Sequence, residues 1–168
     1  MSNPVVLIVM GSDSDVPTME ESAKILTEFG VPFEMRISSA HRSPERTAKL
    51  AHEAADRGIK LIIAAAGMAA HLAGVVAAET TLPVIGVPMG GGPLSGMDAL
   101  YATVQMPGGI PVATMAIGKA GAKNAGLFAV QILSLADPTL REKFAAYRAS
   151  MAVEVEQKDR ALQASRGV

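Results

Sequence analysis

Two serines, a histidine and an arginine lie within residues 38–42 of the segment 38–44, Ser-Ser-Ala-His-Arg-Ser-Pro. The imidazole of His41 can carry a proton near neutral pH, and the guanidinium of Arg42 can bind an anion such as a phosphate. Ser39 adds a hydroxyl that can hydrogen-bond the same ligand. The alternative is a polar turn ahead of a helix, with His41 and Arg42 solvated, and this segment alone slightly favours that alternative.

A second polar segment, Gly-Ser-Asp-Ser-Asp at 11–15, follows the apolar run 5–10. Backbone N–H groups and the Ser12 hydroxyl could bind a phosphate at the start of the following helix. Asp15 is better suited to accepting hydrogen bonds from ribose hydroxyls. The segment is neither Gly-x-Gly-x-x-Gly nor a P-loop, so helix capping by Ser14 and Asp15 is an equally good interpretation.

His71 lies within the apolar stretch 61–78, which Gly67 divides into a strand-like and a helix-like half. The small residues of segment 66–70 would let backbone N–H groups approach a carboxylate or a flat ring closely. A buried core histidine and a ligand-binding histidine are equally good interpretations of His71. The stretch is long enough for a membrane span, but its alanines, glycines and central histidine favour a buried strand followed by a buried helix.

The third histidine, His52, precedes Glu53 in a predicted helix. Asp56 stands where a His-Glu-x-x-His zinc motif would need its second histidine. The sequence contains no cysteine, and no other histidine spacing is typical of a metal site. We therefore expect no bound metal.

Apolar runs alternate with helical patterns along the chain, and together they predict the fold. Strands are predicted over 5–10, 33–37, 61–65, 83–88 and 112–117. Helices are predicted from Asp15 to Gly30 and over 44–57, 71–80, 97–104 and 123–135. Five such repeats predict a three-layer α/β sandwich with a parallel sheet. Ligands of such sheets bind at the carboxyl ends of the strands, so the three polar segments should meet at one edge.

Length and composition predict one α/β domain over 1–168, with a core over about 5–135 and a helical extension over about 138–160. The extension carries an apolar stripe, which favours contact with a neighbouring subunit over packing on its own subunit: Leu140, Phe144, Tyr147, Met151 and Val155. The net charge of -1 gives no reason to expect nucleic acid or an anionic membrane as a partner. The lack of cysteine and of a signal-peptide pattern makes a cytoplasmic location the default expectation.

Several ordered motifs, spread over residues 5–135, resemble one known family. They are Val-Met-Gly-Ser-Asp-Ser-Asp at 9–15, Ser-Ala-His-Arg at 39–42, Ala-Ala-His-Leu at 69–72, Val-Ile-Gly-Val-Pro at 84–88, Gln-Met-Pro at 105–107 and Ile-Gly-Lys-Ala-Gly-Ala-Lys-Asn-Ala at 117–125. In these motifs the chain is similar to the N5-carboxyaminoimidazole ribonucleotide mutase family of purine biosynthesis. The resemblance implies a flavodoxin-like subunit in a homo-octamer, without metal or organic cofactor. It implies a reaction that moves a carboxylate from the exocyclic nitrogen to ring carbon 4 of an aminoimidazole ribonucleotide.

The resemblance also implies roles for residues of the polar segments. His41 would be the general acid and base, and His71 would line the same pocket. Arg42 would face the phosphate of the ribonucleotide and Asp15 its ribose. The full set of substrate-binding candidates is Ser12, Asp15, Ser39, Arg42, Gly67 and His71.

Some positions depart from the family pattern, and others distinguish this chain from the family's other branch. The family's other branch, which uses free CO2, typically has lysine at the position of Arg42 and lacks segment 69–72. Met68 stands where glycine is common, Ala73 where proline is common, and the loop 90–93 is unusually rich in glycine. A non-catalytic, flavodoxin-like module that binds a flavin or nucleotide is the alternative class; it predicts a bound chromophore and no effect of His41→Asn.

Overall fold

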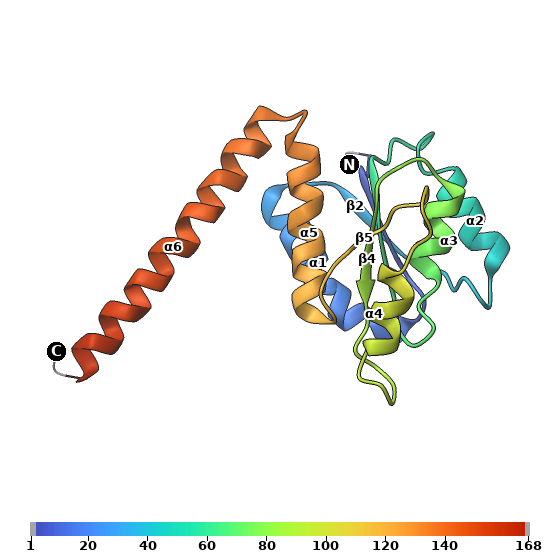
Figure 1. The fold of residues 1–168 in the computed structure, drawn as a ribbon. Helices are drawn as coiled ribbons and strands as arrows, with labels where there is room; N and C mark the ends of the chain where they lie inside the picture. Colours follow the sequence, from blue (N-terminus) through green and yellow to red (C-terminus); the bar gives the residue numbers. More distant parts are fainter. Residues whose placement is uncertain (1–2, 167–168) are drawn as a thin grey trace. The chain divides into compact units, whose positions relative to one another are not determined.

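The computed structural model describes residues 3–166 and divides into two compact units, one ending at Ala129 and one beginning at Val130. The first unit holds one parallel sheet of five strands in the order β2-β1-β3-β4-β5 (Figure 1). This is the order of a flavodoxin-like fold. The predicted three-layer α/β architecture is therefore confirmed.

The strands are β1 (Val6–Met10), β2 (Phe33–Ile37), β3 (Leu61–Ala66), β4 (Val84–Pro88) and β5 (Ala113–Thr114). The helices are the short 3₁₀ turn η1 (Asp13–Asp15), α1 (Val16–Phe29), α2 (Pro44–His52), α3 (Leu72–Glu79), α4 (Met97–Val104), α5 (Lys119–Ser134) and α6 (Pro138–Arg166). The bounds predicted for β2 and α4 match these ranges.

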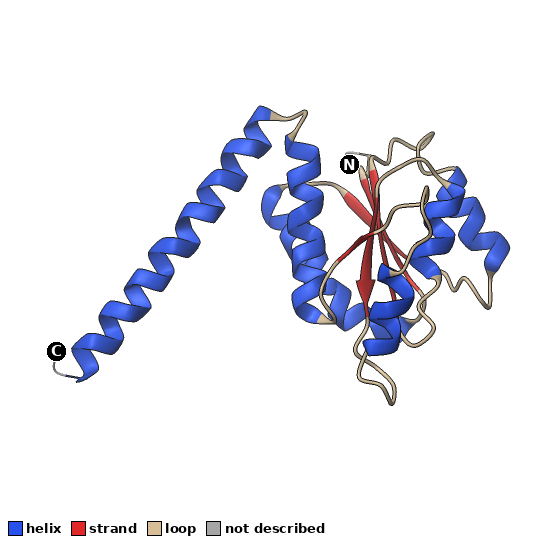
Figure 2. Cartoon of the chain, viewed as in Figure 1, coloured by secondary structure: helices blue, strands red, loops and turns tan. Residues whose placement is uncertain are grey.

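Helices cover both faces of the sheet (Figure 2). On one face α1 packs against the part of α5 that precedes Ala129, where the Ser22 hydroxyl of α1 donates to the Ala122 carbonyl. The other face carries α2, α3 and α4, over a core that includes Leu7, Ile62 and Leu72. Every β1 residue is at most 1% exposed, as its continuous apolar run predicts. Each such fully buried aliphatic side chain contributes about 1.5–3 kcal/mol to folding.

Three predicted element bounds were wrong. Helix α2 ends at His52, and the chain continues in hydrogen-bonded turns to Gly58. Gly58 still ends this segment, because its φ of +91° allows the Ile59 N–H to bond the Ala54 carbonyl. Strand β5 has two residues instead of six, because only Ala113 and Thr114 pair with β4. Helix α5 begins at Lys119, four residues before the predicted start.

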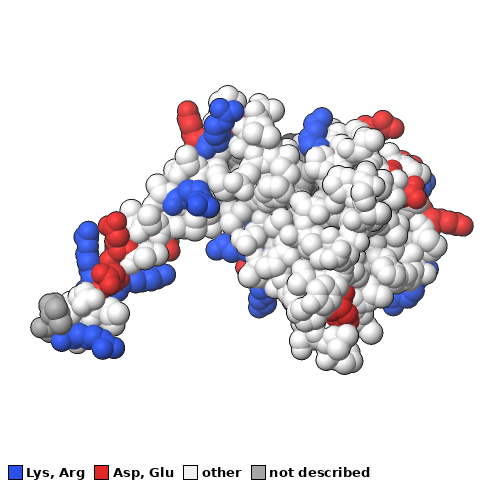
Figure 3. All heavy atoms as spheres, viewed as in Figure 1, with Lys and Arg blue, Asp and Glu red and all other residues white. Residues whose placement is uncertain are grey.

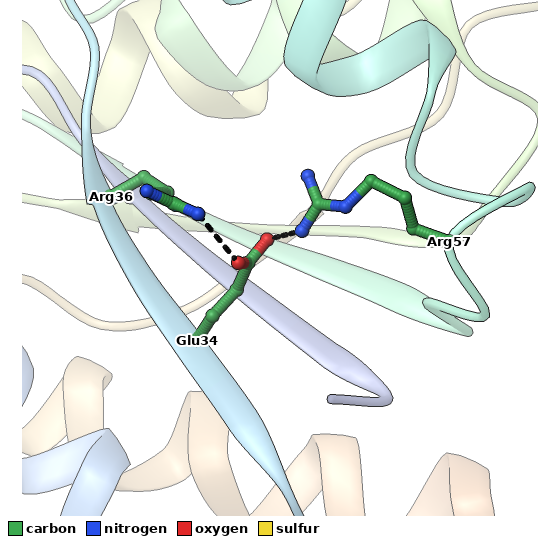
Figure 4. Close-up of polar contacts among 3 residues, drawn as sticks. All are labelled: Glu34, Arg36 and Arg57. Carbon is green, nitrogen blue, oxygen red and sulfur yellow. Dashed lines mark hydrogen bonds and ion pairs between the residues drawn. The ribbon is translucent and has the colours of Figure 1, made fainter. Parts of the chain in front are cut away.

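An ion-pair cluster fixes the edge strand β2 to the turn that precedes β3 (Figure 4). Glu34 of β2 contacts the Arg36 guanidinium at 3.2 Å and also forms an ion pair with Arg57. The Glu34 side chain is only 17% exposed, so these contacts are less screened than surface pairs.

The second unit contains the end of α5 and the helix α6. Helix α6 has 29 residues and is longer than the predicted extension, which stopped near 160. Of its apolar stripe, Leu140 is buried and Val155 is exposed. Arg141 donates to the carbonyls of Ser134 and Leu135, which joins the beginning of α6 to the end of α5.

Acidic and basic side chains are interspersed on the face drawn in Figure 3, where the described residues form no patch of one sign. Among residues 3–166, none of the helices is both long enough and apolar enough to span a bilayer. The apolar stretch 61–78 is divided between β3 and α3, as its glycine and histidine predicted.

Candidate active site

Backbone hydrogen bonds continue past the strand ends and bring four loops to the same level. The Gly11 N–H donates to the Ala65 carbonyl at 3.1 Å, which extends the pairing of β1 with β3. The Ser38 N–H donates to the Met10 carbonyl at 2.8 Å, and the Met89 N–H to the Ala66 carbonyl at 2.9 Å. The loops after β1, β2, β3 and β4 therefore start side by side at the carboxyl edge of the sheet.

These loops enclose a cavity of about 650 Å³. All seven residues that the sequence singled out line it: Ser12, Asp15, Ser39, His41, Arg42, Gly67 and His71. A cavity of this size accommodates a small ligand such as a nucleotide. The three polar segments, predicted to meet because each follows the carboxyl end of a parallel strand, thus line one cavity in the structure.

In the first loop, the hydroxyl groups of Ser12 and Ser14 hydrogen-bond within the turn. The Asp15 carboxylate makes no hydrogen bond that caps α1. The Ser14 hydroxyl donates to Ser12 Oγ at 2.9 Å, and Ser12 Oγ also accepts from the Ser14 N–H at 3.3 Å. Asp15 occupies the N-cap position of α1, but its side chain makes no capping hydrogen bond. Burial raises the pKa of Asp15, opposed by hydrogen bonds from the Ser12 backbone and Ser14. The capping interpretation therefore holds for the position of Asp15 but not for its side chain.

In the second loop, Ser39 and Arg42 are joined to each other and to the first loop. Ser39 Oγ accepts from the Arg42 N–H at 3.2 Å. Arg42 Nη2 donates to the Gly11 carbonyl at 3.1 Å, which ties the loop after β2 to the loop after β1. Arg42 Nε also donates to Ser39 Oγ at 3.5 Å, so the N–H groups of Nη1 are the ones available to a ligand in the cavity. The contact with Gly11 fixes the orientation of the Arg42 guanidinium. A guanidinium held in this way can bind an anion.

A pair of buried hydroxyls holds the base of this loop. Ser38 and Thr47 are 2% and 1% exposed, and their hydroxyl oxygens lie 2.9 Å apart. The Thr47 hydroxyl lies 3.2 Å from the Ser43 carbonyl. The loop is therefore anchored to β2 at one end and to the first turn of α2 at the other, which limits where His41 can lie.

The two histidines contact each other across the cavity. His41 Nε2 and His71 Nδ1 lie 2.8 Å apart, and the rings meet edge to face with centroids 4.9 Å apart. Such a bond needs one proton between the two facing nitrogens, so one ring donates and the other accepts. Both side chains are exposed, so a ligand can reach them from the cavity. His71 is thus not a buried core residue, which was one of the two interpretations left open.

The loop after β4 also lines the cavity, which sequence reasoning did not predict. Met89, Gly91 and Gly92 join the wall, together with Met68 from the loop after β3. Glycine and methionine carry no titratable group, so a search for chemical groups passes over them. Met89, Gly91 and Gly92 could have been identified because they follow a predicted strand. The same rule identified the other three loops.

The cavity combines a cation, a carboxylate, hydroxyls and a proton-carrying imidazole pair. Within residues 3–166, no group of three or more His, Cys, Asp or Glu side chains is arranged to hold a metal ion. Arg42 and the loop N–H groups can bind an anion, and Asp15 can accept hydrogen bonds from a sugar. The histidine pair can donate or accept a proton beside that ligand. These groups suit acid–base chemistry on a phosphorylated sugar derivative.

Comparison with known proteins identifies the family. The family model described as AIR carboxylase matches residues 5–154, nearly the whole chain. The chain belongs to this family. Proteins named N5-carboxyaminoimidazole ribonucleotide mutase are its relatives. The one from Pyrococcus horikoshii is 54% identical, over 95% of this chain and 89% of that protein. The one from Synechocystis sp. is 58% identical, over 89% and 84%.

Solved structures agree with the family assignment. The crystal structure of Treponema denticola PurE superposes on this family member with a TM-score of 0.85 and 34% identity, and covers 95% of this chain and 99% of that one. A second structure from the same organism, PurE2-S38D, gives a TM-score of 0.87 and 31% identity, over 96% and 99%. The flavodoxin-like fold implied by the sequence resemblance is confirmed.

Proposed function

We propose that this family member is an N5-carboxyaminoimidazole ribonucleotide mutase, an isomerase of purine biosynthesis. Its substrate and product differ only in whether the carboxylate is on the exocyclic nitrogen or on ring carbon 4. The observation that carries the proposal is the hydrogen-bonded His41–His71 pair in the same cavity as Arg42 and Asp15. The mutase names of relatives more than 50% identical to the chain support it independently.

In this proposal the polar loops bind the ribonucleotide. Arg42 takes the phosphate, because its guanidinium is fixed by Gly11 and retains free N–H donors. Asp15 takes the ribose hydroxyls, since its carboxylate is not used in capping. Ser12, Ser39 and Gly67 complete the site: Gly67 presents backbone without a side chain, and its missing Cβ would lie 3.4 Å from the Met89 Cβ.

His41 is the proposed general acid and base. Loss of CO2 breaks the C–N bond of the carbamate, and the nitrogen takes a proton as the bond breaks. Ring carbon 4 then attacks CO2, a C–C bond forms, and the proton on that carbon must leave. The net result is one proton carried between two neighbouring atoms of the bound base, which a single imidazole can do.

His71 is proposed to orient His41 and to share its proton. The 2.8 Å contact fixes Nε2 of His41 against Nδ1 of His71, so the His41 ring is not free to rotate. When His41 gives up its proton, His71 can supply the proton that keeps the pair hydrogen-bonded. A carboxylate near the pair would also be attracted to its N–H groups.

We further propose a homo-octamer, with α6 crossing to a neighbouring subunit, and a cytoplasmic location. Apolar side chains on α4 support association, because Met97, Tyr101 and Val104 are 43%, 59% and 48% exposed along one helix face. On α6, Val155 is 66% exposed. Light scattering coupled to size exclusion tests this: the proposal predicts the mass of eight chains of 17.3 kDa, and a monomer would contradict it.

The activity is tested by mixing the purified protein with N5-carboxyaminoimidazole ribonucleotide in the absence of ATP and bicarbonate. The proposal predicts its conversion to the carbon-carboxylated isomer and a colourless protein. Carboxylation of aminoimidazole ribonucleotide that requires added CO2, with no isomerisation, would instead assign the chain to the branch that uses free CO2. A co-purified flavin with no turnover would assign it to the non-catalytic class.

A further inference from the structure

Ser43 occupies the N-cap position of α2, but its hydroxyl does not cap the helix. A serine at this position normally accepts a hydrogen bond from one of the first backbone N–H groups of the helix. The Ser43 side chain makes no such bond. Its Oγ instead donates to the Ser39 carbonyl at 3.0 Å and accepts from the Ser39 N–H at 3.1 Å. The hydroxyl therefore stabilises the preceding loop in place of the helix.

These bonds close the segment 39–43 into a hydrogen-bonded ring. The Ser43 N–H also donates to the Ser39 carbonyl, at 2.8 Å, so hydrogen bonds from both the backbone and the side chain join the two ends. The Thr47 N–H donates to the Ser43 carbonyl at 3.1 Å, and the Thr47 hydroxyl lies 2.9 Å from the buried Ser38 hydroxyl. Ser43 thus links the ring to the buried base of the loop.

The ring carries His41 and Arg42, whose side chains are held differently. Arg42 is also fixed from the loop after β1, because its Nη2 donates to the Gly11 carbonyl. For the His41 side chain, the described part of the chain provides one hydrogen bond, the 2.8 Å contact with His71 Nδ1. A shift of about 1 Å breaks such a bond, since donor and acceptor must lie within about 2.7–3.2 Å. The place of His41 therefore depends on the backbone of its own loop.

We propose that Ser43 is a positioning residue, which keeps the 39–43 ring closed and thereby holds His41 in place for proton transfer. This inference rests on the proposed function, in which His41 moves the proton. Ser43 does not line the cavity, so it acts through His41 and not on the substrate. A displacement of about 1 Å at a reacting group can lower a rate by about 10²-fold. Nucleotide binding depends less on Ser43, because Arg42 stays fixed to Gly11.

The test measures the single-turnover rate, with enzyme in excess, and the Kd of the nucleotide product. For Ser43→Ala, which removes only the hydroxyl, the proposal predicts a rate about tenfold lower and a Kd that changes by less than about threefold. Ser43→Thr keeps the hydroxyl, so its rate should lie within about threefold of the wild-type rate. Ser43→Ala should fold, since α2 does not use this hydroxyl as a cap.

Thr80→Val is the matched control. Thr80 follows α3 and does not line the cavity, and its hydroxyl accepts from the Leu82 N–H at 3.2 Å. The exchange therefore also removes one loop hydroxyl with little change in shape. Its rate and Kd should both stay within about threefold of the wild-type values.

A double variant separates positioning of His41 from a general effect on the fold. If Ser43 acts through His41, Ser43→Ala should lower the rate by less than about threefold in the His41→Asn background. A tenfold loss in both backgrounds, a wild-type rate for Ser43→Ala, or an equal loss in Thr80→Val would overturn the inference. Failure of Ser43→Thr to keep the rate, or an unfolded Ser43→Ala, would also overturn it, because the hydroxyl would then serve another purpose. A wild-type protein that does not isomerise the substrate would instead overturn the proposed function.

Discussion

Replacing Arg42 with lysine tests how the phosphate is bound. The Arg42 guanidinium donates to the Gly11 carbonyl at 3.1 Å and keeps other N–H groups for the ligand. Lysine keeps the charge, but its single ammonium cannot make both contacts in one planar geometry. The loss of one charge-assisted hydrogen bond costs about 1.5–3 kcal/mol, and the exposure of Arg42 favours the lower value. At 1.4 kcal/mol per factor of ten, KM should rise by about tenfold.

The kcat of Arg42→Lys should change by less than about threefold, because a phosphate contact is equally strong before and during the reaction. Steady-state rates over a range of substrate concentrations give both constants. Arg46→Lys is the control, since Arg46 is an exposed residue of α2 that does not line the cavity. A fall in kcat with unchanged KM would refute the assignment, because it would place Arg42 at the reacting atoms.

Two further predictions concern stability. Burial raises the pKa of Asp15. This shift therefore adds to the free energy of unfolding below pH 3.8, and the contribution is lost as the pH rises through the folded-state pKa. Asp15→Asn should therefore raise the Tm of the ligand-free protein at pH 7, but not below pH 3.8, while nucleotide binding weakens; a lower Tm at pH 7 would contradict this. A Cβ at Gly86 would clash with Thr103 and lie 2.9 Å from Val112, so Gly86→Ala should cost about 1–3 kcal/mol in urea unfolding. Gly108→Ala, which meets nothing within 4 Å, should change little, and equal effects of the two would show that packing is not the cause.

The strand-end rule is what made the site predictable from sequence. Apolar runs such as 5–10 are long and continuous, so they identify the buried strands, and the polar residues that follow them must share one edge. That reasoning brought Ser12, His41 and His71 together. It could not predict the 2.8 Å contact between the histidines, because the approach of two loops depends on side-chain packing.

Weak local signals account for the errors. The apolar pattern of 112–117 overstated the length of β5, because only Ala113 and Thr114 pair with β4 and apolar residues alone do not show where pairing stops. The helical pattern of 44–57 continued past His52, where hydrogen-bonded turns close the segment at Gly58 instead. The left-handed conformation of Met68 had no signal within the chain, since a methionine gives no sign of positive φ.

The most direct measurement compares wild type and His41→Asn in a single turnover, with enzyme in excess, and determines the Kd of the nucleotide product for each. Our account assigns His41 to proton transfer and the other loops to binding. It therefore predicts a rate that falls by about 10²–10⁴-fold, with a Kd that changes by less than about threefold. A variant that turns over at nearly the wild-type rate, or one whose loss is entirely in nucleotide binding, would contradict it.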